Sequence, residues 1–331
     1  MAPLVLVAPD SFKGTFPAAR VADALAAGIE EAGARADRCP VADGGEGTLD
    51  VLVAARGGEV RIAPARDPLG RPLPAARWAL LDDGATAVVE TAEASGLALV
   101  DPAERDAEAA STAGTGELIA AAAAAGAREI LVAVGGSATT DGGRGAIDAI
   151  AAAGGLRGAR LAVLCDVTTP FEDAARIYGP QKGAGPAAVE RLTARLHALA
   201  AQLPRDPRGR PMTGAAGGLS GGLWAAFGAR LAPGAAAVLD AVGFDARLAA
   251  ADAVVAGEGR VDGQSLAGKI VGEIAARARA AGRPLHVVAG TDALDPAQRA
   301  ALGLASVTAA PTLDAIRAAG RTIAHAVAAQ A

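Results

Sequence analysis

The chain has 331 residues, of which 52% are hydrophobic and 2% aromatic, and its formal net charge is −5. Acidic and basic residues are interspersed without a basic stripe, which argues against a nucleic-acid partner. The chain has neither a run of about 18 apolar residues nor a basic leader before its first apolar run, so we expect no membrane span, no secretion and a cytoplasmic location.

The chain opens with alternating strand and helix patterns. Residues 4–8 are predicted as a buried strand and residues 17–31 as an amphipathic helix. A second strand ends near Val41, and after the loop 43–47 a helix runs to about Ala55. Such alternation favours a parallel sheet covered by helices, with ligand crevices at the carboxyl ends of the strands.

The segment 64–74 breaks this rhythm, and its prolines and glycine predict a crossing between domains. Beyond it we expect short strands, a long helix from about Glu117 and a loop-like region at 204–222. The predicted strands of this middle part are 78–81, 87–90, 130–134 and 161–165, followed by a helix at 186–203. The last predicted strands are 253–256, 285–289 and 305–308.

These last three strands resemble the opening ones in length and apolarity. A chain of this length is long enough for two domains with separate cores. We therefore predict a discontinuous, three-layer α/β domain with a parallel sheet, formed by residues 1–65 and 247–331. A second α/β domain, residues 66–246, is inserted into it, and the active-site cleft is expected between the two.

The chain has three lysines among its 31 basic residues, and each lysine adjoins a glycine. They are Lys13, Lys182 and Lys269. An ammonium group beside flexible backbone N–H groups is typical of a phosphate contact. Coincidence is the alternative, since arginines in this chain also adjoin glycines.

Cysteine and histidine give no sign of a metal site. Cys39 and Cys165 are far apart in the sequence, no C-x-x-C occurs and the three histidines are scattered, which argues against zinc. We expect both thiols to be buried and unreactive. Acid–base chemistry would then fall to carboxylates.

Several loops combine glycine with acids, hydroxyls or lysine. Residues 10–15 follow the first strand, where a simple turn capped by Thr15 is the alternative. Residues 43–48 open a helix, whose free N–H groups attract anions, although a solvated acidic turn is also open. Residues 135–143 follow an apolar strand and are predicted to bind phosphate.

The later loops are more ambiguous. Asp166 suits Mg²⁺ or a capping role, and the small residues of 214–222 suit ligand approach or close helix packing. Residues 263–269 fit the P-loop pattern G-x-x-x-x-G-K, but Ile270 stands where that loop needs Ser or Thr. No G-x-G-x-x-G follows the first strand, which counts against a dinucleotide-binding dehydrogenase.

In order along the chain, these segments resemble the type-1 glycerate kinase family. The matching motifs are APDSFK at 8–13, PVADGGEGT at 40–48, GTGEL at 114–118, GGSAT at 135–139, CDV at 165–167, YGPQKGA at 178–184, GAAGG at 214–218 and GEGRVD at 257–262. They span nearly the whole chain. Two departures stand out: the segment 149–160 is shorter than is usual in the family, and Thr140 stands where asparagine is common.

The resemblance implies transfer of the ATP γ-phosphate to D-glycerate with Mg²⁺, giving 2-phosphoglycerate, in a fold of two α/β domains. Three alternatives stay open. They are a glycerate 3-kinase giving 3-phosphoglycerate, a P-loop-like NTPase centred on 263–269, and a non-catalytic protein that binds phosphorylated metabolites. A homodimer is also left open.

On this hypothesis Lys13 and Arg260 contact anionic groups near the reacting centre. Asp43 and Asp262 are the candidates for the metal ligand and for the base that orients the hydroxyl group. Which of the two residues has which role is left open. The predicted substrate-binding residues are Asp10, Ser11, Gly44, Gly45, Glu46 and Glu258. The predicted nucleotide-binding residues are Gly135, Gly136, Ser137, Thr139, Lys182, Gly217, Gly218 and Lys269. The predicted metal ligands are Asp166 and Asp262.

Overall fold

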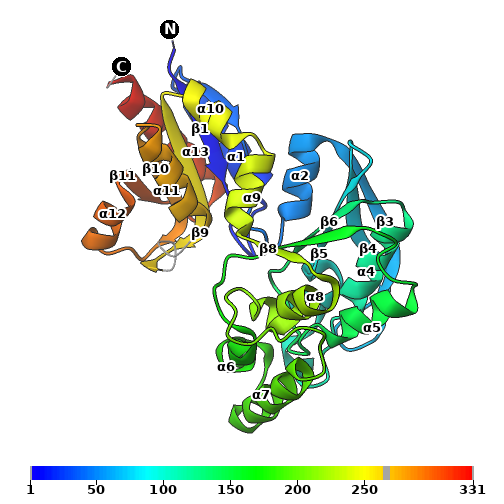
Figure 1. Ribbon diagram of the computed structural model, residues 1–331. Helices are drawn as coiled ribbons and strands as arrows, with labels where there is room; N and C mark the ends of the chain where they lie inside the picture. The colour runs from blue at the N-terminus through cyan, green and yellow to red at the C-terminus, as the bar shows by residue number, and fades with distance from the viewer. Residues whose placement is uncertain (1, 264–268, 330–331) are drawn as a thin grey trace. The chain divides into compact units, whose positions relative to one another are not determined.

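The computed structural model describes residues 2–263 and 269–329 (Figure 1). The chain divides into two compact units. Unit 1 comprises Met1–Asp43 with Ala235–Ala331, and unit 2 comprises Gly44–Gly234. Unit 1 is therefore discontinuous in sequence, whereas unit 2 is a single stretch of chain.

Unit 1 is built on a five-stranded sheet in the order β11-β10-β9-β1-β2, in which every neighbouring pair is parallel. Its strands are β1 (Leu4–Pro9), β2 (Arg35–Arg38), β9 (Ala253–Val261), β10 (Leu285–Asp292) and β11 (Leu304–Ala309). Parallel neighbours require crossover connections, and helices supply them. The helices of unit 1 are α1 (Ala18–Glu31), α9 (Gly234–Ala241), α10 (Phe244–Ala250), α11 (Ile270–Ala280), α12 (Pro296–Leu302) and α13 (Leu313–Ala328).

Helices cover both faces of this sheet. On one face α1 and α13 pack on apolar residues of β1 and β9, including Val5, Val7 and Val255. The two helices approach closely, because a Cβ added to Gly28 would lie 1.9 Å from the carbonyl oxygen of Arg317. On the other face α10 contacts β1, and α11 contacts β9 and β10 (Figure 1). The predicted three-layer fold with a parallel sheet is confirmed.

Unit 2 is built on a six-stranded sheet in the order β3-β4-β5-β6-β7-β8. Its strands are β3 (Gly58–Arg66), β4 (Pro72–Leu81), β5 (Thr86–Glu90), β6 (Glu129–Ala133), β7 (Arg160–Leu164) and β8 (Arg230–Ala232). The pairs β3–β4 and β4–β5 are antiparallel, and the pairs from β5 to β8 are parallel. Both this sheet and its helices agree with the predicted second α/β fold.

The helices of unit 2 are α2 (Thr48–Arg56), α3 (Ala92–Ser95), α4 (Ala113–Ala124), α5 (Arg144–Ala152), α6 (Ala174–Tyr178), α7 (Pro186–Ala200) and α8 (Leu219–Phe227). Apolar residues of α4, α5 and α8 form one core with β5, β6 and β7. A smaller core under α6 and α7 is centred on Phe171, Leu192 and Leu196. Across both units, no helix in the described ranges has the length and apolarity needed to cross a membrane.

The boundaries between the two units, at 43/44 and 234/235, differ from the domain boundaries predicted at 65/66 and 246/247. The segment 64–74 does not cross between units, because β3 and β4 pair as an antiparallel hairpin and this segment contains their turn. At the other end, α9 belongs to unit 1, where Asp240 of α9 pairs with Arg277 of α11 at 2.8 Å. The chain leaves unit 1 after Asp43, within a motif that the sequence presented as one loop.

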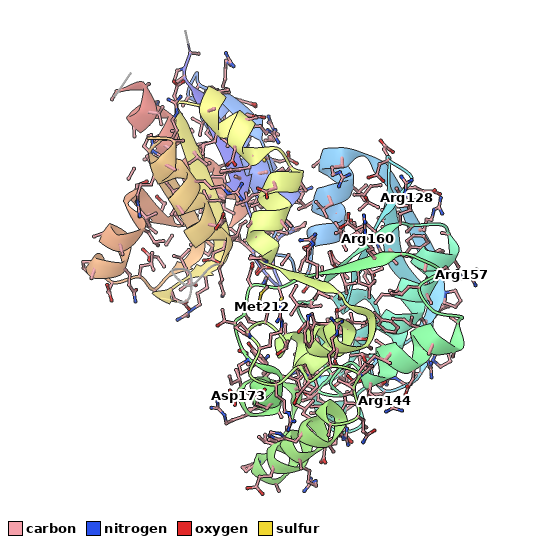
Figure 2. All side chains as sticks on the ribbon, viewed as in Figure 1. Arg128, Arg144, Arg157, Arg160, Asp173 and Met212 are labelled. Atoms are coloured by element: carbon pink, nitrogen blue, oxygen red, sulfur yellow. The ribbon has the colours of Figure 1, made fainter. Side chains whose placement is uncertain are left out.

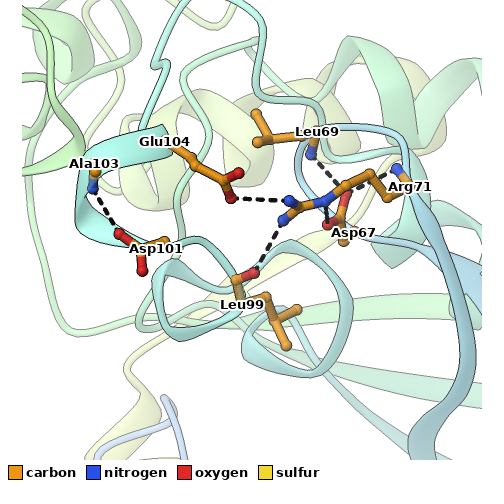
Figure 3. A network of polar contacts seen from close by, with 7 residues as sticks. All are labelled: Asp67, Leu69, Arg71, Leu99, Asp101, Ala103 and Glu104. Atoms are coloured by element: carbon orange, nitrogen blue, oxygen red, sulfur yellow. Dashed lines mark hydrogen bonds and ion pairs between the residues drawn. The ribbon is translucent and has the colours of Figure 1, made fainter.

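The β3–β4 turn is fixed by a polar network (Figure 3). Asp67 accepts hydrogen bonds from the backbone N–H groups of Leu69 and Arg71, both at 2.9 Å. The Arg71 guanidinium bonds to Asp67 at 2.5 Å and to Glu104 at 2.9 Å. Although burial opposes the charge, these donors lower the pKa of Asp67. The turn is therefore held by paired charges as well as by its prolines.

The shortened segment 149–160 comprises the end of α5, the connection to β7 and the first residue of β7. Residues 153–159 link the two elements, and Arg157 there adopts a left-handed φ of 51°. Arg157 projects outward at the edge of unit 2 (Figure 2). The two cysteines are buried and free, Cys39 in unit 1 and Cys165 in unit 2. Burial raises their thiol pKa values to about 11 and about 12, as expected for inert thiols.

Candidate functional site

Unit 1 contains a cavity of about 490 Å³ at the carboxyl ends of its parallel strands. Eight residues predicted from the sequence line it: Asp10, Ser11, Lys13, Asp43, Glu258, Arg260, Asp262 and Lys269. The lining also includes Gly290, Thr291 and Pro311, which the sequence analysis missed. They lie in β10 or just after β11, so the rule that ligands bind at the carboxyl ends of parallel strands would have pointed to them.

The loop after β1 is anchored so that Lys13 reaches this cavity. The backbone N–H of Asp10 donates to Gly257 of β9 at 2.8 Å. Phe12, which is 2% exposed, exchanges backbone hydrogen bonds with Phe16 at 2.8 and 3.0 Å. A buried phenylalanine and a closed backbone turn thus hold the base of the loop while Lys13 stays on its rim.

Lys13 and Asp43 form an ion pair in the cavity, with 3.0 Å between Nζ and Oδ2. The Lys13 side chain is 58% exposed and that of Asp43 is 17% exposed. Partial enclosure opposes the lysine charge, but the carboxylates of Asp43 and Asp10 outweigh it and raise the pKa of Lys13. The ammonium therefore stays protonated near neutral pH.

The pKa of Asp10 is strongly shifted in this cavity. It is 3% exposed, and burial together with the neighbouring charge of Asp43 raises its pKa to about 8, although Lys13 acts in the opposite direction. The charge of Glu258 raises this pKa further. Such crowding of carboxylates disfavours ionisation of Asp10 and is relieved when a cation binds among them.

A second charged pair lies at the end of β9. Arg260 donates from Nε to Asp262 at 3.1 Å, and the arginine side chain is 63% exposed. The two residues are separated by Val261, so an extended backbone directs their side chains to the same side. The cavity thus combines two exposed cations, Lys13 and Arg260, with the carboxylates that hold them.

The glycine loops of unit 2 pack against one another. A Cβ added to Gly135 would lie 2.6 Å from Cα of Gly45, and one added to Gly136 would lie 3.6 Å from the Glu46 carboxylate. A Cβ added to Gly217 would lie 2.0 Å from the carbonyl oxygen of Thr139. Close packing is sufficient to require glycine at 135 and 217, whereas the left-handed φ of 65° favours glycine at 136. The nucleotide-binding role of these glycines stays a prediction.

The buried side chain of Lys182 is hydrogen-bonded to the glycine loop 135–143. Its side chain donates to Ser137 Oγ at 2.9 Å and to the Thr139 carbonyl at 2.5 Å, and the residue is 2% exposed. Burial lowers its pKa to about 7, while Asp141 acts in the opposite direction. Seven predicted residues therefore come together in unit 2: Gly135, Gly136, Ser137, Thr139, Lys182, Gly217 and Gly218.

The lowered pKa of Lys182 predicts a pH dependence of stability. Between about pH 7 and the ordinary lysine pKa of 10.5, the unfolded chain binds a proton that the folded chain lacks, so folding gains stability as pH rises. Relative to Lys182→Met, the wild type should gain up to about 1.4 kcal/mol per pH unit above pH 7. Urea unfolding followed by tryptophan fluorescence measures this, because Trp78 and Trp224 both lie in unit 2.

Leu223→Ala is the matched control, since it removes a buried apolar side chain of the same unit. Its cost should be independent of pH. A difference between the wild type and Lys182→Met that is equally flat with pH would contradict the buried, weakly basic lysine.

Glu90 is a buried carboxylate that the sequence analysis missed. It ends β5, is 3% exposed and accepts a hydrogen bond from the backbone N–H of Leu49 at 2.5 Å. Burial raises its pKa to about 7, and the N–H groups of Leu49 and Gly47 act in the opposite direction. Glu90 thus caps the first turn of α2 and fixes the end of the loop 44–47.

Glu90→Leu is expected to destabilise unit 2 by about 1–3 kcal/mol, because it leaves a buried backbone N–H without an acceptor. Glu90→Gln retains an acceptor oxygen and should recover most of the loss. Fluorescence-monitored urea unfolding at one pH compares the three proteins. A leucine variant as stable as the wild type would show that the cap contributes nothing.

The two predicted metal ligands belong to different units. Asp262 lines the cavity of unit 1, whereas Asp166 in unit 2 accepts a hydrogen bond from the Gly234 N–H at 2.7 Å. Among the residues that the structure describes, no group of three or more His, Cys, Asp and Glu side chains is arranged to hold a metal. Mg²⁺ commonly uses one or two carboxylates and completes its shell with phosphate oxygens and water.

Residues 264–268 of the P-loop-like pattern lie outside the described residues. At its end, Lys269 is the residue before α11 and lines the cavity of unit 1. Of the eight predicted nucleotide-binding residues, Lys269 alone therefore belongs to unit 1.

The chain matches the model of the glycerate kinase family over residues 5–154 and 152–329. It is 36% identical over 324 residues to the glycerate 2-kinase of Escherichia coli (strain K12), with 87% of this chain and 85% of that protein covered. It is 37% identical to the glycerate kinase of Bacillus subtilis (strain 168), over 88% of this chain and 86% of that protein. A solved structure from Salmonella typhimurium LT2, described as a glycerate kinase 2, has a TM-score of 0.84 at 34% identity and covers 100% of this chain and 99% of that chain.

Proposed function

The chain belongs to the glycerate kinase family, and we propose that it transfers the γ-phosphoryl group of ATP to the 2-hydroxyl of D-glycerate, with Mg²⁺ as the metal. The observation that carries this proposal is the cavity of unit 1, where Lys13 pairs with Asp43 and Arg260 pairs with Asp262. The similarity to a glycerate 2-kinase supports the 2-hydroxyl as the acceptor.

The residues of the cavity fit a divalent ion. Carboxylate oxygens are ligands that Mg²⁺ takes in proteins, and the cavity presents Asp10, Asp43, Glu258 and Asp262. Burial, together with the neighbouring charges of Asp43 and Glu258, raises the pKa of Asp10 to about 8, and a bound cation would relieve the repulsion between these carboxylates. Asp43 and Asp262 are the proposed ligands in this cavity, and Mg²⁺ bound there would neutralise charge on phosphate oxygens.

The proposed reaction is an in-line displacement. The glycerate hydroxyl oxygen forms a bond to the γ-phosphorus, the bond from that phosphorus to the β–γ bridging oxygen breaks, and ADP leaves. The hydroxyl proton passes to a carboxylate, for which Asp43 and Asp262 are the two candidates. Lys13 and Arg260 hold the anionic groups and offset the charge that spreads over the transferred phosphoryl oxygens.

We assign the nucleotide phosphates to the glycine loops of unit 2, together with Lys269. Thr139 and Thr140 support this assignment. Both are fully buried, and within the described residues their hydroxyl oxygens have no hydrogen-bond partner. Buried hydroxyl groups without partners are costly, and phosphate oxygens would satisfy them. Asp166 remains a proposed metal ligand in addition to its bond with Gly234.

A coupled ADP-release assay with Mg-ATP and D-glycerate tests the proposal. Glycerate-dependent ADP formation is the expected result, and ¹H–³¹P NMR of the product should show 2-phosphoglycerate. A product phosphorylated at the 3-hydroxyl would overturn the proposed position of transfer. ADP release without glycerate would indicate an NTPase, and ATP binding without turnover would indicate a non-catalytic phosphometabolite-binding protein.

A further inference from the structure

Strand β3 forms one edge of the sheet of unit 2. It pairs with β4 on one side, and no strand of the described residues pairs with it on the other. Alternate backbone N–H and C=O groups of an edge strand point away from the sheet and can pair with another strand. Eight of its nine residues are exposed or partly exposed, and Ala65, toward its end, is the buried position.

The first half of β3 carries an apolar surface. Val60 is 41% exposed and Ile62 is 68% exposed. Across the described residues, the large hydrophobic side chains exposed to this degree are these two and Ile177. Val60 and Ile62 are two residues apart, so both point to the same face of the strand. Exposed apolar side chains on an unpaired edge are typical of a contact with another chain.

The second half of β3 is protected against such pairing. Pro64 has no backbone N–H to donate, and the register with β4 shifts between Ala63 and Ala65. The charged turn of Asp67 and Arg71 follows directly. These are devices that keep a sheet edge from pairing, and they leave residues 58–62 as the open part.

The charges on this open part are self-complementary. Glu59 and Arg61 lie on the face opposite to Val60 and Ile62, and they pair with each other within the strand at 2.9 Å. In an antiparallel pair of two β3 strands centred on Val60, Glu59 of each copy stands opposite Arg61 of the other copy. A pair centred on Arg61 would instead oppose two arginines, which is unfavourable.

We propose that the chain forms a symmetric homodimer in which residues 58–62 of β3 pair antiparallel with the same residues of a second copy, centred on Val60. The two sheets then join into one continuous sheet. Val60 meets Val60 of the second copy, and Ile62 meets Gly58 of the second copy. Two reciprocal Glu59–Arg61 pairs flank the centre, as expected for an isologous interface.

Sedimentation velocity of the full chain over a range of concentrations tests the surface. The wild type should sediment at twice the chain mass, and Ile62→Lys should sediment as the single chain because it places a charge in the apolar strip. Ile177→Lys is the matched control, since it changes the exposed apolar residue outside β3, and it should remain dimeric. A wild type that stays monomeric, or a dimer that persists in Ile62→Lys, would overturn the proposal.

A crosslinking experiment tests the register separately. Residues directly opposite in an antiparallel pair have Cβ atoms about 4.5–5.5 Å apart, close to disulfide range. Val60→Cys should therefore form a disulfide-linked dimer under mild oxidation, while Cys39 and Cys165 are buried and stay reduced. Ile62→Cys stands four residues out of register with its copy and should not crosslink. Equal crosslinking of the two variants would refute the centre at Val60.

Discussion

Asp262→Asn is expected to abolish most of the turnover while ATP still binds. The asparagine amide keeps the shape of the side chain but can neither accept the hydroxyl proton nor give Mg²⁺ a charged ligand. The loss of a positioned general base alone lowers kcat by roughly 10²- to 10⁴-fold. It also leaves Arg260, which pairs with Asp262 at 3.1 Å, without its carboxylate.

Steady-state kinetics with D-glycerate and Mg-ATP give kcat, and calorimetry gives the Kd for ATP. Asp314→Asn is the matched control, because Asp314 is an exposed carboxylate in the first turn of α13 and does not line the cavity. It should behave as the wild type. An Asp262→Asn enzyme with the wild-type kcat would remove Asp262 from the catalytic groups.

Lys13→Ala is expected to lower kcat/KM by roughly one to two orders of magnitude. A charge-assisted hydrogen bond contributes about 1.5–3 kcal/mol, and each 1.36 kcal/mol corresponds to about a factor of ten in rate. The effect is larger if the ammonium contacts charge that develops only in the transition state. Because the Lys13 side chain is 58% exposed, its removal should cost little folding stability.

The same variant should change the pH profile of kcat/KM. The Lys13 charge lowers the pKa of Asp10, so its loss raises that pKa further, and any activity that requires ionised Asp10 moves to higher pH. Lys13→Arg keeps the charge and should retain the wild-type profile with reduced activity. A folded Lys13→Ala enzyme with unchanged kcat/KM would exclude Lys13 from the site.

The sequence predicted most of the strands and helices of unit 1 correctly, because β1, β9 and β10 contain short apolar runs. β2 ends at Arg38 rather than near Val41, since its residues, RADR, carry no apolar run. β3 was missed because its alternation of Val60 and Ile62 with charged residues is interrupted by Pro64. The prolines of the following turn then suggested a crossing between domains. Proline is compatible with an edge strand, so the composition alone did not distinguish a hairpin at an edge from a linker.

Within the site, acids and lysines near the ends of strands were predictable, and six of them line one cavity together with Ser11 and Arg260. Thr291 and Pro311 were not predicted, because the chain after β10 and β11 carries no lysine and no glycine-rich motif. Glu90 was missed because it ends an apolar strand, although a glutamate in that position is itself a signal of a buried acceptor. Gly135 and Gly217 were predicted to bind a ligand, although close packing against backbone already requires glycine there. That backbone comes from a distant part of the chain, so the sequence alone did not reveal the contact.

The division of the chain has a consequence for its synthesis. All of unit 2 has been translated once Gly234 is made, so this unit can fold while the ribosome adds the rest. β1 is the first strand to be synthesised, yet its neighbour β9 begins only at Ala253. The apolar residues of β1 must therefore stay uncovered on one edge until nearly the last quarter of the chain emerges. We expect the nascent chain to depend on chaperones during this interval, and a ribosome-stalled chain ending near residue 240 to bind them through its N-terminal segment.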